Sequence, residues 1–394
     1  MKKAIRQLAA AINRANPSAS FSFELWDGEV IEYGDQPKTT LIIKSAKVLE
    51  QMFSKGFLGF GEAYVSGDLE VEGDLQELLR LGLSVQFDEK NFSLLEKIRL
   101  LPFYFKTLGT AGKARGNIAH HYDLTPEFFS LFLDESLTYS CCYFKNEDDS
   151  LGQAQRNKYD HIARKLMLSP ADTLVDIGCG WGGMLLHSTR EYGTRGVGIT
   201  LSRNQSQYVS RRIQDLGLGE RIEVRLQDYR QLTGKFDKFV SIGMFEHVGK
   251  RFIPVYMRKT AALLKKGGLG LLHTIANELD SATDAWMFRY IFPGGYIPSL
   301  AETVREMGRA GLSVLDIEGL RLHYGRTLDC WIVNFEGNID KIREIFDERF
   351  VRMWRLYMNA SSACFKYNGT RVYQILFSNG MNNDLPMGRE YMYR

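Results

Sequence analysis

The N-terminal part of the chain alternates short hydrophobic segments with glycine, aspartate and proline. Residues 21–33 and 39–45 place hydrophobic side chains at every second position, which is typical of half-buried strands. Residues 74–83 instead carry leucines at helical spacing. The mixture predicts a small α+β domain that covers residues 1–90.

A different pattern begins at Thr173. Strand-like and helix-like segments alternate there, and the strand-like ones read TLVDI, GVGIT, IEVRLQD, FDKFVSIG and GLGLLHTI. This alternation favours a parallel sheet with helices on both faces. Residues 314–321 and 327–336 predict a pair of antiparallel edge strands, and residues 340–365 predict a helical tail. The predicted fold class is α/β, a doubly wound and mostly parallel sheet with an antiparallel edge strand, plus the small α+β domain.

The length of 394 residues agrees with two domains, because single hydrophobic cores stop growing near ~250–300 residues. In residues 91–116, apolar and aromatic side chains interleave with lysine and arginine, and the stretch ends with glycines. We interpret these residues as a linker. Residues 117–394 are then predicted to form the larger domain.

Glycines cluster in the segment VDIGCGWGG, residues 175–183, between a strand-like and a helix-like segment. An open α/β sheet binds its ligand at such a turn. The spacing is GxGxGG, not the GxGxxG of dinucleotide-binding proteins, and the next strand lacks the acidic residue that binds their ribose. Together with Asp176, the loop resembles motif I of class I S-adenosylmethionine (SAM) methyltransferases. The alternative is a structural turn that binds nothing.

The stretch TLSRNQ, residues 200–205, departs from the commonest methyltransferase pattern, and it resembles the cyclopropane synthases and their mycolic-acid relatives. Further segments similar to that family follow in order: HYDL from His121, YSC from Tyr139, LQDY from Leu226, GMFEHVG from Gly243, LHTI from Leu272, YIFPGG from Tyr290 and HY from His323. The segment GEAY from Gly61 resembles the bacterial phospholipid-type synthases in particular.

This resemblance implies a cyclopropane-fatty-acyl-phospholipid synthase. Such an enzyme transfers the methyl carbon of SAM to a cis double bond of a phospholipid acyl chain. A proton must then leave the resulting cation so that the ring closes, and water must be kept out. The resemblance implies that these residues bind the cofactor: Tyr139, Ser140, Asp176, Gly178, Cys179, Gly180, Gly182, Thr200, Leu201, Gln205, Gln227, Asp228 and Tyr229.

The resemblance also implies that a bound bicarbonate ion removes the proton. Its pocket would be formed by the backbone at Cys141 and Ile275 and by the side chains of Glu246, His273 and Tyr324. These groups match the donor and acceptor atoms of bicarbonate. Each has a structural alternative: a solvated loop glutamate, a core histidine and a routine buried tyrosine. Cys141 is not expected to be a nucleophile, because no basic partner is recognisable.

Composition excludes several other classes. The formal net charge is +3, too small for a dominant phosphate footprint, so no nucleic-acid partner is expected. The five cysteines include no C-x-x-C pair, so we expect neither a metal site nor disulfides. No apolar run approaches the ~20 residues needed to cross a bilayer. We therefore expect a cytoplasmic protein associated peripherally with the membrane.

Two segments suit contact with an unsaturated phospholipid bilayer. They are residues 92–105 and the stripe of Ile5, Leu8, Ala9 and Ile12, where apolar side chains lie near basic ones. The alternative is that both pack inside the protein. The aromatic segment 286–298 is a candidate wall for the acyl chain, and a homodimer would engage the membrane at two points.

Other functions are considered alongside ring formation. A relative acting on the same alkene would produce a methyl-branched or hydroxylated acyl chain. A small-molecule N- or O-methyltransferase would not explain the lipid-family segments, and a non-catalytic SAM- or lipid-binding protein would not need the intact site residues. The presence of Glu246, His273 and Tyr324 together favours ring closure.

Overall fold

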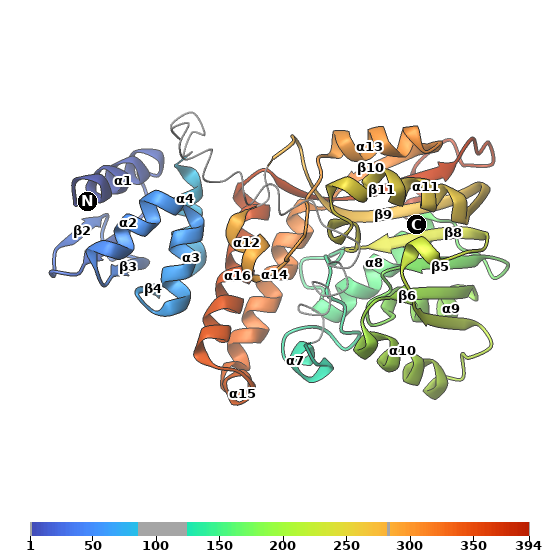
Figure 1. Ribbon diagram of the computed structural model, residues 1–394, viewed down its shortest axis with the longest axis horizontal. Coiled ribbons are helices and arrows are strands. Elements are labelled where there is room, and N and C mark those ends of the chain that lie inside the picture. Colours follow the sequence, from blue (N-terminus) through green and yellow to red (C-terminus); the bar gives the residue numbers. More distant parts are fainter. Residues whose placement is uncertain (1, 86–123, 282–283, 394) are drawn as a thin grey trace. The chain divides into compact units, whose positions relative to one another are not determined.

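The computed structural model describes residues 2–85, 124–281 and 284–393, and the chain divides into two compact units (Figure 1). Each unit is assembled from stretches that are far apart in the sequence. Among the described residues, the first unit comprises 2–85, 284–293 and 328–369. The second comprises 124–281, 294–327 and 370–393.

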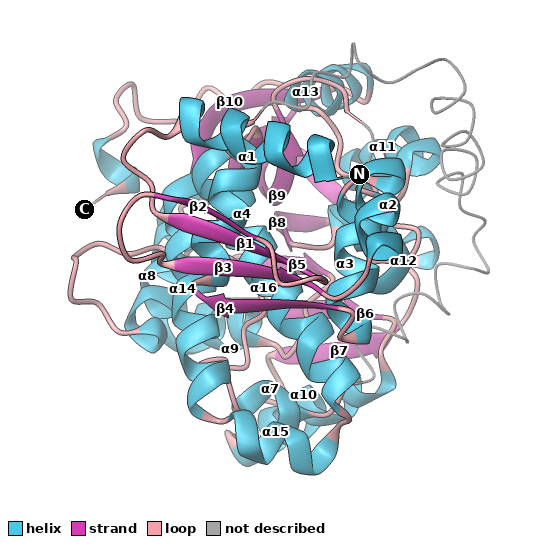
Figure 2. Cartoon of the chain, turned by 90° about the vertical axis from the view of Figure 1, so that its left-hand side faces the viewer, coloured by secondary structure: helices cyan, strands magenta, loops and turns pink. Residues whose placement is uncertain are grey.

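The N-terminal part of the first unit is a four-stranded sheet with helices. Its strands have the order β2-β1-β3-β4, as Figure 2 shows, and β1 pairs in parallel with β3. Phe21, Phe23, Leu41 and Ile43 alternate with less buried residues and are buried, as their spacing predicted. The elements are α1 (Lys2–Ala15), β1 (Phe21–Leu25), β2 (Val30–Tyr33), β3 (Thr39–Ile43), α2 (Ala46–Lys55), α3 (Phe57–Ser66), β4 (Leu69–Gly73) and α4 (Leu75–Ser84).

The apolar stripe of α1 faces the interior of this unit. Ile5, Ala9 and Ile12 are buried, and Leu8 is partly buried. The stripe therefore packs inside the protein, and the expectation that it contacts a bilayer is wrong, because one helical face cannot serve both purposes. The other segment proposed for membrane contact, 92–105, and the predicted linker 91–116 lie outside the described residues. In the part of the chain that the structure covers, no helix is long and apolar enough to cross a membrane.

The first unit also contains helices from the second half of the chain. Arg352 of α16 donates to the backbone oxygens of Tyr64 and Leu69 and pairs with Glu70. Trp286 of α12 is buried so close to Gly61 that a Cβ at that glycine would overlap its ring. This division differs from the expected boundaries of 1–90 and 117–394. The helices are α12 (Ala285–Tyr290), the part of α14 (Arg321–Gly337) from residue 328, α15 (Ile339–Ile345) and α16 (Glu348–Tyr367).

The second unit is built around a seven-stranded sheet of order β10-β11-β9-β8-β5-β6-β7, parallel except at β11. Phe239 and Leu272 lie in one core with α11 and α13; Val240 and Leu271 lie in the other with α8, α9 and α10. The sheet is thus covered on both faces (Figure 1). The strands are β5 (Thr173–Ile177), β6 (Arg195–Thr200), β7 (Ile222–Leu226), β8 (Phe236–Ile242), β9 (Leu264–Asn277), β10 (Leu312–Gly319) and β11 (Thr370–Asn379). The helices are α7 (Pro126–Ser130), α8 (Leu151–Lys165), α9 (Gly183–Tyr192), α10 (Arg203–Asp215), α11 (Ile253–Leu263) and α13 (Leu300–Arg309).

The predicted edge of the sheet is only half right. Residues 314–321 do contribute β10, but residues 327–336 form the middle of α14, and β11 comes from residues 370–379. The buried side chains of the misassigned segment are Leu328, Trp331 and Phe335, at spacings of three and four. That spacing belongs to one face of a helix, and the apolar run Trp-Ile-Val concealed it.

Two substitutions in α14 test this helix. Trp331 is fully buried and Val333 is 69% exposed, whereas in a strand both side chains would point to the same face. We expect Trp331→Ala to lower the free energy of unfolding by about 3–5 kcal/mol, and Val333→Ala to change it by no more than about 0.5 kcal/mol. Urea unfolding curves of both variants measure the difference. Similar losses in the two variants would contradict the helix.

Candidate active site

The glycine loop links β5 to α9 at the carboxyl edge of the parallel strands. Gly178, Gly180 and Gly182 all have positive φ, and the backbone N–H of Gly178 donates to Ile199 on the neighbouring strand. A Cβ at Gly178 would lie 2.6 Å from Cβ of Met244, so only glycine fits. Around Gly180, by contrast, no described atom lies within 4 Å of such a Cβ. One side of the loop is therefore open to a ligand.

The ends of β6 and β7 lie next to this loop in the sheet order. Thr200 Oγ1 donates to Oε1 of Gln205 at 2.7 Å, and the backbone N–H of Gln227 donates to Thr200 O at 3.1 Å. These contacts hold the turn that contains Leu201. Asp228 accepts hydrogen bonds from Arg230, and Tyr229 follows it in a short 3-10 helix (Tyr229–Gln231). The sheet thus brings the cofactor residues predicted on three separate segments to one edge.

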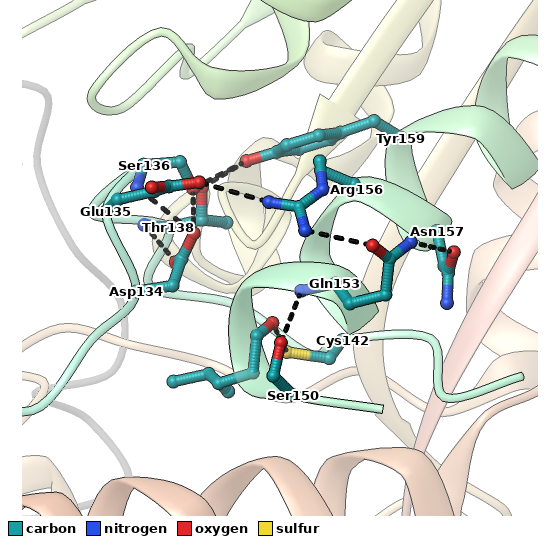
Figure 3. A network of polar contacts seen from close by, with 11 residues as sticks. Asp134, Glu135, Ser136, Thr138, Cys142, Ser150, Gln153, Arg156, Asn157 and Tyr159 are labelled. Carbon is teal, nitrogen blue, oxygen red and sulfur yellow. Dashed lines mark hydrogen bonds and ion pairs between the residues drawn. The ribbon is translucent and has the colours of Figure 1, made fainter. Parts of the chain in front are cut away.

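The segment around Tyr139 and Ser140 is held by α8 and by aromatic packing. Asp134, Ser136 and Thr138 form a polar network with Tyr159 of α8 (Figure 3). The ring of Phe129 lies 5.5 Å from that of Tyr139 and 5.8 Å from that of Trp181 in the glycine loop. The aromatic cluster therefore places Tyr139 close to the predicted cofactor loop.

Buried polar side chains of helix α8 lie beneath this segment. The amide nitrogen of Gln155 donates to the carbonyls of Thr138 and Ser140, and Lys158 Nζ donates to Ser140 Oγ at 2.8 Å. Lys158 is fully buried, and burial lowers its pKa to about 8. Burial raises the pKa of Asp176 to about 7, although the Lys158 charge opposes this shift. A buried cation and a buried carboxyl group thus lie under the predicted cofactor site.

The raised pKa of Asp176 predicts a pH-dependent stability in the ligand-free protein. Because the folded protein keeps a proton on this carboxyl group that the unfolded chain has lost, stability falls as the pH rises from about 4 to 7, by up to ~1.4 kcal/mol per pH unit. We expect Asp176→Asn to remove this slope, so that the stability of the variant relative to the wild type increases between pH 5 and pH 7. Urea unfolding at several pH values measures it, with the exposed Asp215→Asn as control. Parallel profiles of wild type and Asp176→Asn would refute the assignment.

Glu246 and His273 come from neighbouring strands and meet at the same edge. Oε1 of Glu246 accepts the backbone N–H of Ile275 at 2.6 Å, and the N–H of Gly243 donates to the carbonyl of His273 at 2.9 Å. Burial raises the pKa of Glu246; burial, followed by the charges of Lys158 and Lys165, lowers that of His273 well below its usual value. Both groups are therefore biased toward their neutral forms.

Cys141 and Tyr324 are connected through the first turns of α14. The backbone N–H of Cys142 donates to Thr327 Oγ1 at 3.0 Å, and that of Phe144 donates to Nδ1 of His323 at 3.0 Å. Tyr324 lies between these two contacts on the helix. The thiol of Cys141 is buried, which raises its pKa well above the usual value. Such a thiol is a poor nucleophile.

The segments that carry these groups lie next to one another. A Cβ at Gly243 would lie 4.0 Å from that of Ser140, which links the segment of Cys141 to the loop of Glu246. The sequence reasoning missed the polar face of α8, whose buried members include Gln155, Lys158, His161 and Lys165. Their spacing of three and four could have revealed this face from the sequence, because side chains at such spacing lie on one face of a helix.

The residues present fit a ligand that has both donor and acceptor atoms. Within the described residues, Oε2 of Glu246 and Nε2 of His273 are buried without a hydrogen-bond partner. Unsatisfied buried polar atoms are costly, and a bound group with donor and acceptor atoms would satisfy both. The backbone N–H of Ile275, in contrast, is already engaged by Glu246. No cluster that could hold a metal ion was found among the described residues.

The chain is similar to known proteins along most of its length. The model of the mycolic acid cyclopropane synthetase family matches residues 110–375, and a domain family of unknown function matches residues 10–89. The chain is 37% identical to the "probable fatty acid methyltransferase" of Pseudomonas putida (94% of this chain, 95% of the relative) and 33% identical to the cyclopropane-fatty-acyl-phospholipid synthase of Escherichia coli K12 (88% and 90%).

A solved structure agrees with these sequence matches. The mycolic acid cyclopropane synthase CmaA1, in complex with SAH and CTAB, is similar with a TM-score of 0.64 and 31% identity, over 67% of this chain and 98% of that one. The fold of the second unit is thus the class I SAM-methyltransferase fold that the glycine loop predicted. The chain is a SAM-dependent enzyme, and it belongs to the mycolic acid cyclopropane synthetase family.

Proposed function

We propose that this enzyme adds the methyl carbon of SAM to a cis double bond in a phospholipid acyl chain and closes a cyclopropane ring. The observation that carries the proposal is the pair of Glu246 and His273, because each has a buried polar atom without a hydrogen-bond partner within the described residues. An alkene offers no proton to a base before it reacts. A site with neutral buried groups that hold an anion suits removal of a proton from the cation formed afterwards.

SAM supplies an electrophilic methyl group when it is bound. In the proposal, the backbone of the glycine loop faces the cofactor, and Thr200, Leu201 and Gln205 line its binding site from the end of β6. Gln227, Asp228 and Tyr229 contribute from the end of β7, and Tyr139 and Ser140 from the segment above α8. Asp176 lies beneath the loop.

Bicarbonate would supply the proton acceptor when bound. Glu246, His273 and Tyr324 would hold it, together with the backbone at Cys141. Burial raises the pKa of Glu246. Its Oε2, which has no partner within the described residues, can donate to bicarbonate in the acid form and accept the hydroxyl proton of bicarbonate in the ionised form. The backbone at Ile275 stays part of the proposed pocket, and its N–H also orients Glu246 through Oε1.

A second candidate is transfer to the same alkene with a methyl-branched or hydroxylated product. The name of the Pseudomonas putida relative, a fatty acid methyltransferase, is the specific reason to test it. The groups that retain an anion beside His273 favour ring closure over this outcome. The fate of the cation decides between the two products, not the binding of SAM.

The lipid side of the proposal includes an unsaturated phospholipid substrate in a bilayer, peripheral membrane contact, a cytoplasmic location and a homodimer. The aromatic segment 286–298 remains the proposed wall for the acyl chain. Flotation of the full-length protein with anionic vesicles tests membrane contact, and sedimentation velocity tests the dimer. Deleting residues 1–90 would be a poor test, because Trp286 and Arg352 pack against that region.

The deciding experiment mixes the purified protein with SAM and vesicles of unsaturated phospholipid. Fatty acids are then analysed by mass spectrometry and by proton NMR for the high-field cyclopropane signal. A gain of one methylene unit with loss of the double bond and without a branch is the expected product. A branched or hydroxylated chain would support the second candidate. Unchanged lipids in the presence of SAM binding would reject both.

A further inference from the structure

A row of polar side chains, two of them buried and one partly buried, crosses three strands behind the active site. In the ladders of the sheet, Gln374 of β11 is paired with His273 of β9 on one side and with Glu318 of β10 on the other. Directly paired residues point to the same face of a sheet. All three side chains therefore lie on the face that α8 covers. The proposed mechanism uses only His273, at one end of the row.

Glu318 forms the far end of the row, and side chains of α8 stabilise its negative charge. Nε2 of His161 lies 2.6 Å from Oε2 of Glu318, and Lys165 Nζ donates to the same oxygen. Burial alone would raise the pKa of Glu318, but the hydrogen bond of His161 and the charge of Lys165 lower it to about 2. Glu318 is thus ionised and anchored by α8. Elsewhere on the same face, Leu271 and Leu376 pack in the hydrophobic core. The polar row is therefore an exception on a face that is otherwise apolar at these strands.

The contact between Gln374 and His273 bears on which ring nitrogen of His273 carries the proton. The amide nitrogen of Gln374 lies 3.3 Å from Nδ1 of His273, and both side chains are buried. In this orientation of the amide the nitrogen donates and Nδ1 accepts, whereas the reversed amide would accept a proton from Nδ1. A neutral imidazole with an acceptor at Nδ1 carries its proton on Nε2. That Nε2 is the atom left without a partner among the described residues.

We propose that Gln374 is a positioning residue that holds His273 as the Nε2-protonated tautomer, so that His273 serves the site as a hydrogen-bond donor and not as the base. The inference deepens the proposed function and rests on it for the role in catalysis. A ring held in this way presents an N–H to an anion. The same ring cannot take the substrate proton at Nε2, so the proton must go to another acceptor.

The tautomer is measured directly in the full-length protein labelled with ¹⁵N-histidine. Long-range proton–nitrogen correlation spectra distinguish the two neutral tautomers, and the His273 signal is identified by its loss in His273→Gln. We expect the Nε2-protonated form in the wild type. In Gln374→Met, which keeps the size but removes the donor, we expect a population with the proton on Nδ1. An Nδ1-protonated or doubly protonated ring in the wild type would overturn the proposal, even if the variant failed to fold.

Activity supplies the second readout. We expect Gln374→Met to lower kcat by about 10- to 100-fold, as is typical when a partner behind a functional histidine is removed, with the Kd for SAM changed less than about twofold. Ser378 lies on the same face of β11, and its hydroxyl donates to Gly380 O at 2.6 Å, so Ser378→Ala is the control with unchanged kcat. An unchanged kcat or an unchanged tautomer in Gln374→Met would overturn the positioning role.

The two proposals fail in different ways. If the wild type modifies no lipid, the proposed function is rejected, whereas the tautomer and the SAM affinity are still measurable. If the wild type forms the ring but His273 carries its proton on Nδ1, only the role of Gln374 is rejected.

Discussion

Glu246→Gln is expected to lower ring formation by at least about 100-fold while the Kd for SAM stays within about twofold, since loss of a positioned acid–base group typically costs 10²–10⁴ in rate. Glu246 lies in the 3-10 helix Phe245–His247, directly after β8. The glutamine keeps the size of the side chain, and its amide oxygen can still accept from Ile275. In that orientation the amide nitrogen replaces Oε2, so the variant can still donate there but can neither ionise nor accept a hydrogen bond.

The measurement is the initial rate of cyclopropane formation on unsaturated phospholipid vesicles, with SAM affinity measured by calorimetry. Glu306→Gln is the matched control, because Glu306 is buried but pairs with Arg309 on α13, which covers the other face of the sheet. We expect the control to keep full activity. Full activity of Glu246→Gln would remove this residue from the mechanism. If Glu246→Gln forms a methyl-branched or hydroxylated product instead, Glu246 is needed for proton removal but not for methyl transfer.

Gly178→Ala is expected to weaken SAM binding by about tenfold or more. The glycine has φ of +86°, where an L side chain costs about 1–2 kcal/mol, and 1.4 kcal/mol corresponds to a factor of ten in affinity. The added Cβ would also lie 2.6 Å from Cβ and Cγ of Met244. Since Met244 is two residues before Glu246, the overlap disturbs the cofactor loop and the catalytic loop together.

Calorimetric titration with SAM measures the loss. Gly217→Ala is the control, because Gly217 also has positive φ but a Cβ there meets no described atom within 4 Å. The double variant Gly178→Ala/Met244→Gly removes the overlap and leaves the backbone strain, so part of the affinity should return. Equal SAM affinity in Gly178→Ala and the wild type would show that the loop does not need glycine here.

The parallel part of the sheet was predictable from the sequence because its signals are local. Strands β5, β6 and β8 contain short apolar runs, and they are followed by the helices α9, α10 and α11. The cap residue Ser202 before α10 is a further local signal. The carboxyl ends of parallel strands meet at one edge by geometry. Residues predicted from separate segments, such as Thr200 and Gln227, therefore meet without any need to know their packing.

The sequence by itself thus determined the α/β class, the position of the cofactor loop and the family, since each depends on residues close together in the chain. Only the tertiary structure decided which apolar segment forms the antiparallel strand between β9 and β10. Residues 327–336 and 370–379 are both apolar, and the pairing of β11 with β9 joins residues about a hundred positions apart, as His273 and Gln374 show. The burial of the α1 stripe and the polar row behind His273 have the same physical origin. Both are set by what lies opposite a side chain in space, which local periodicity does not encode.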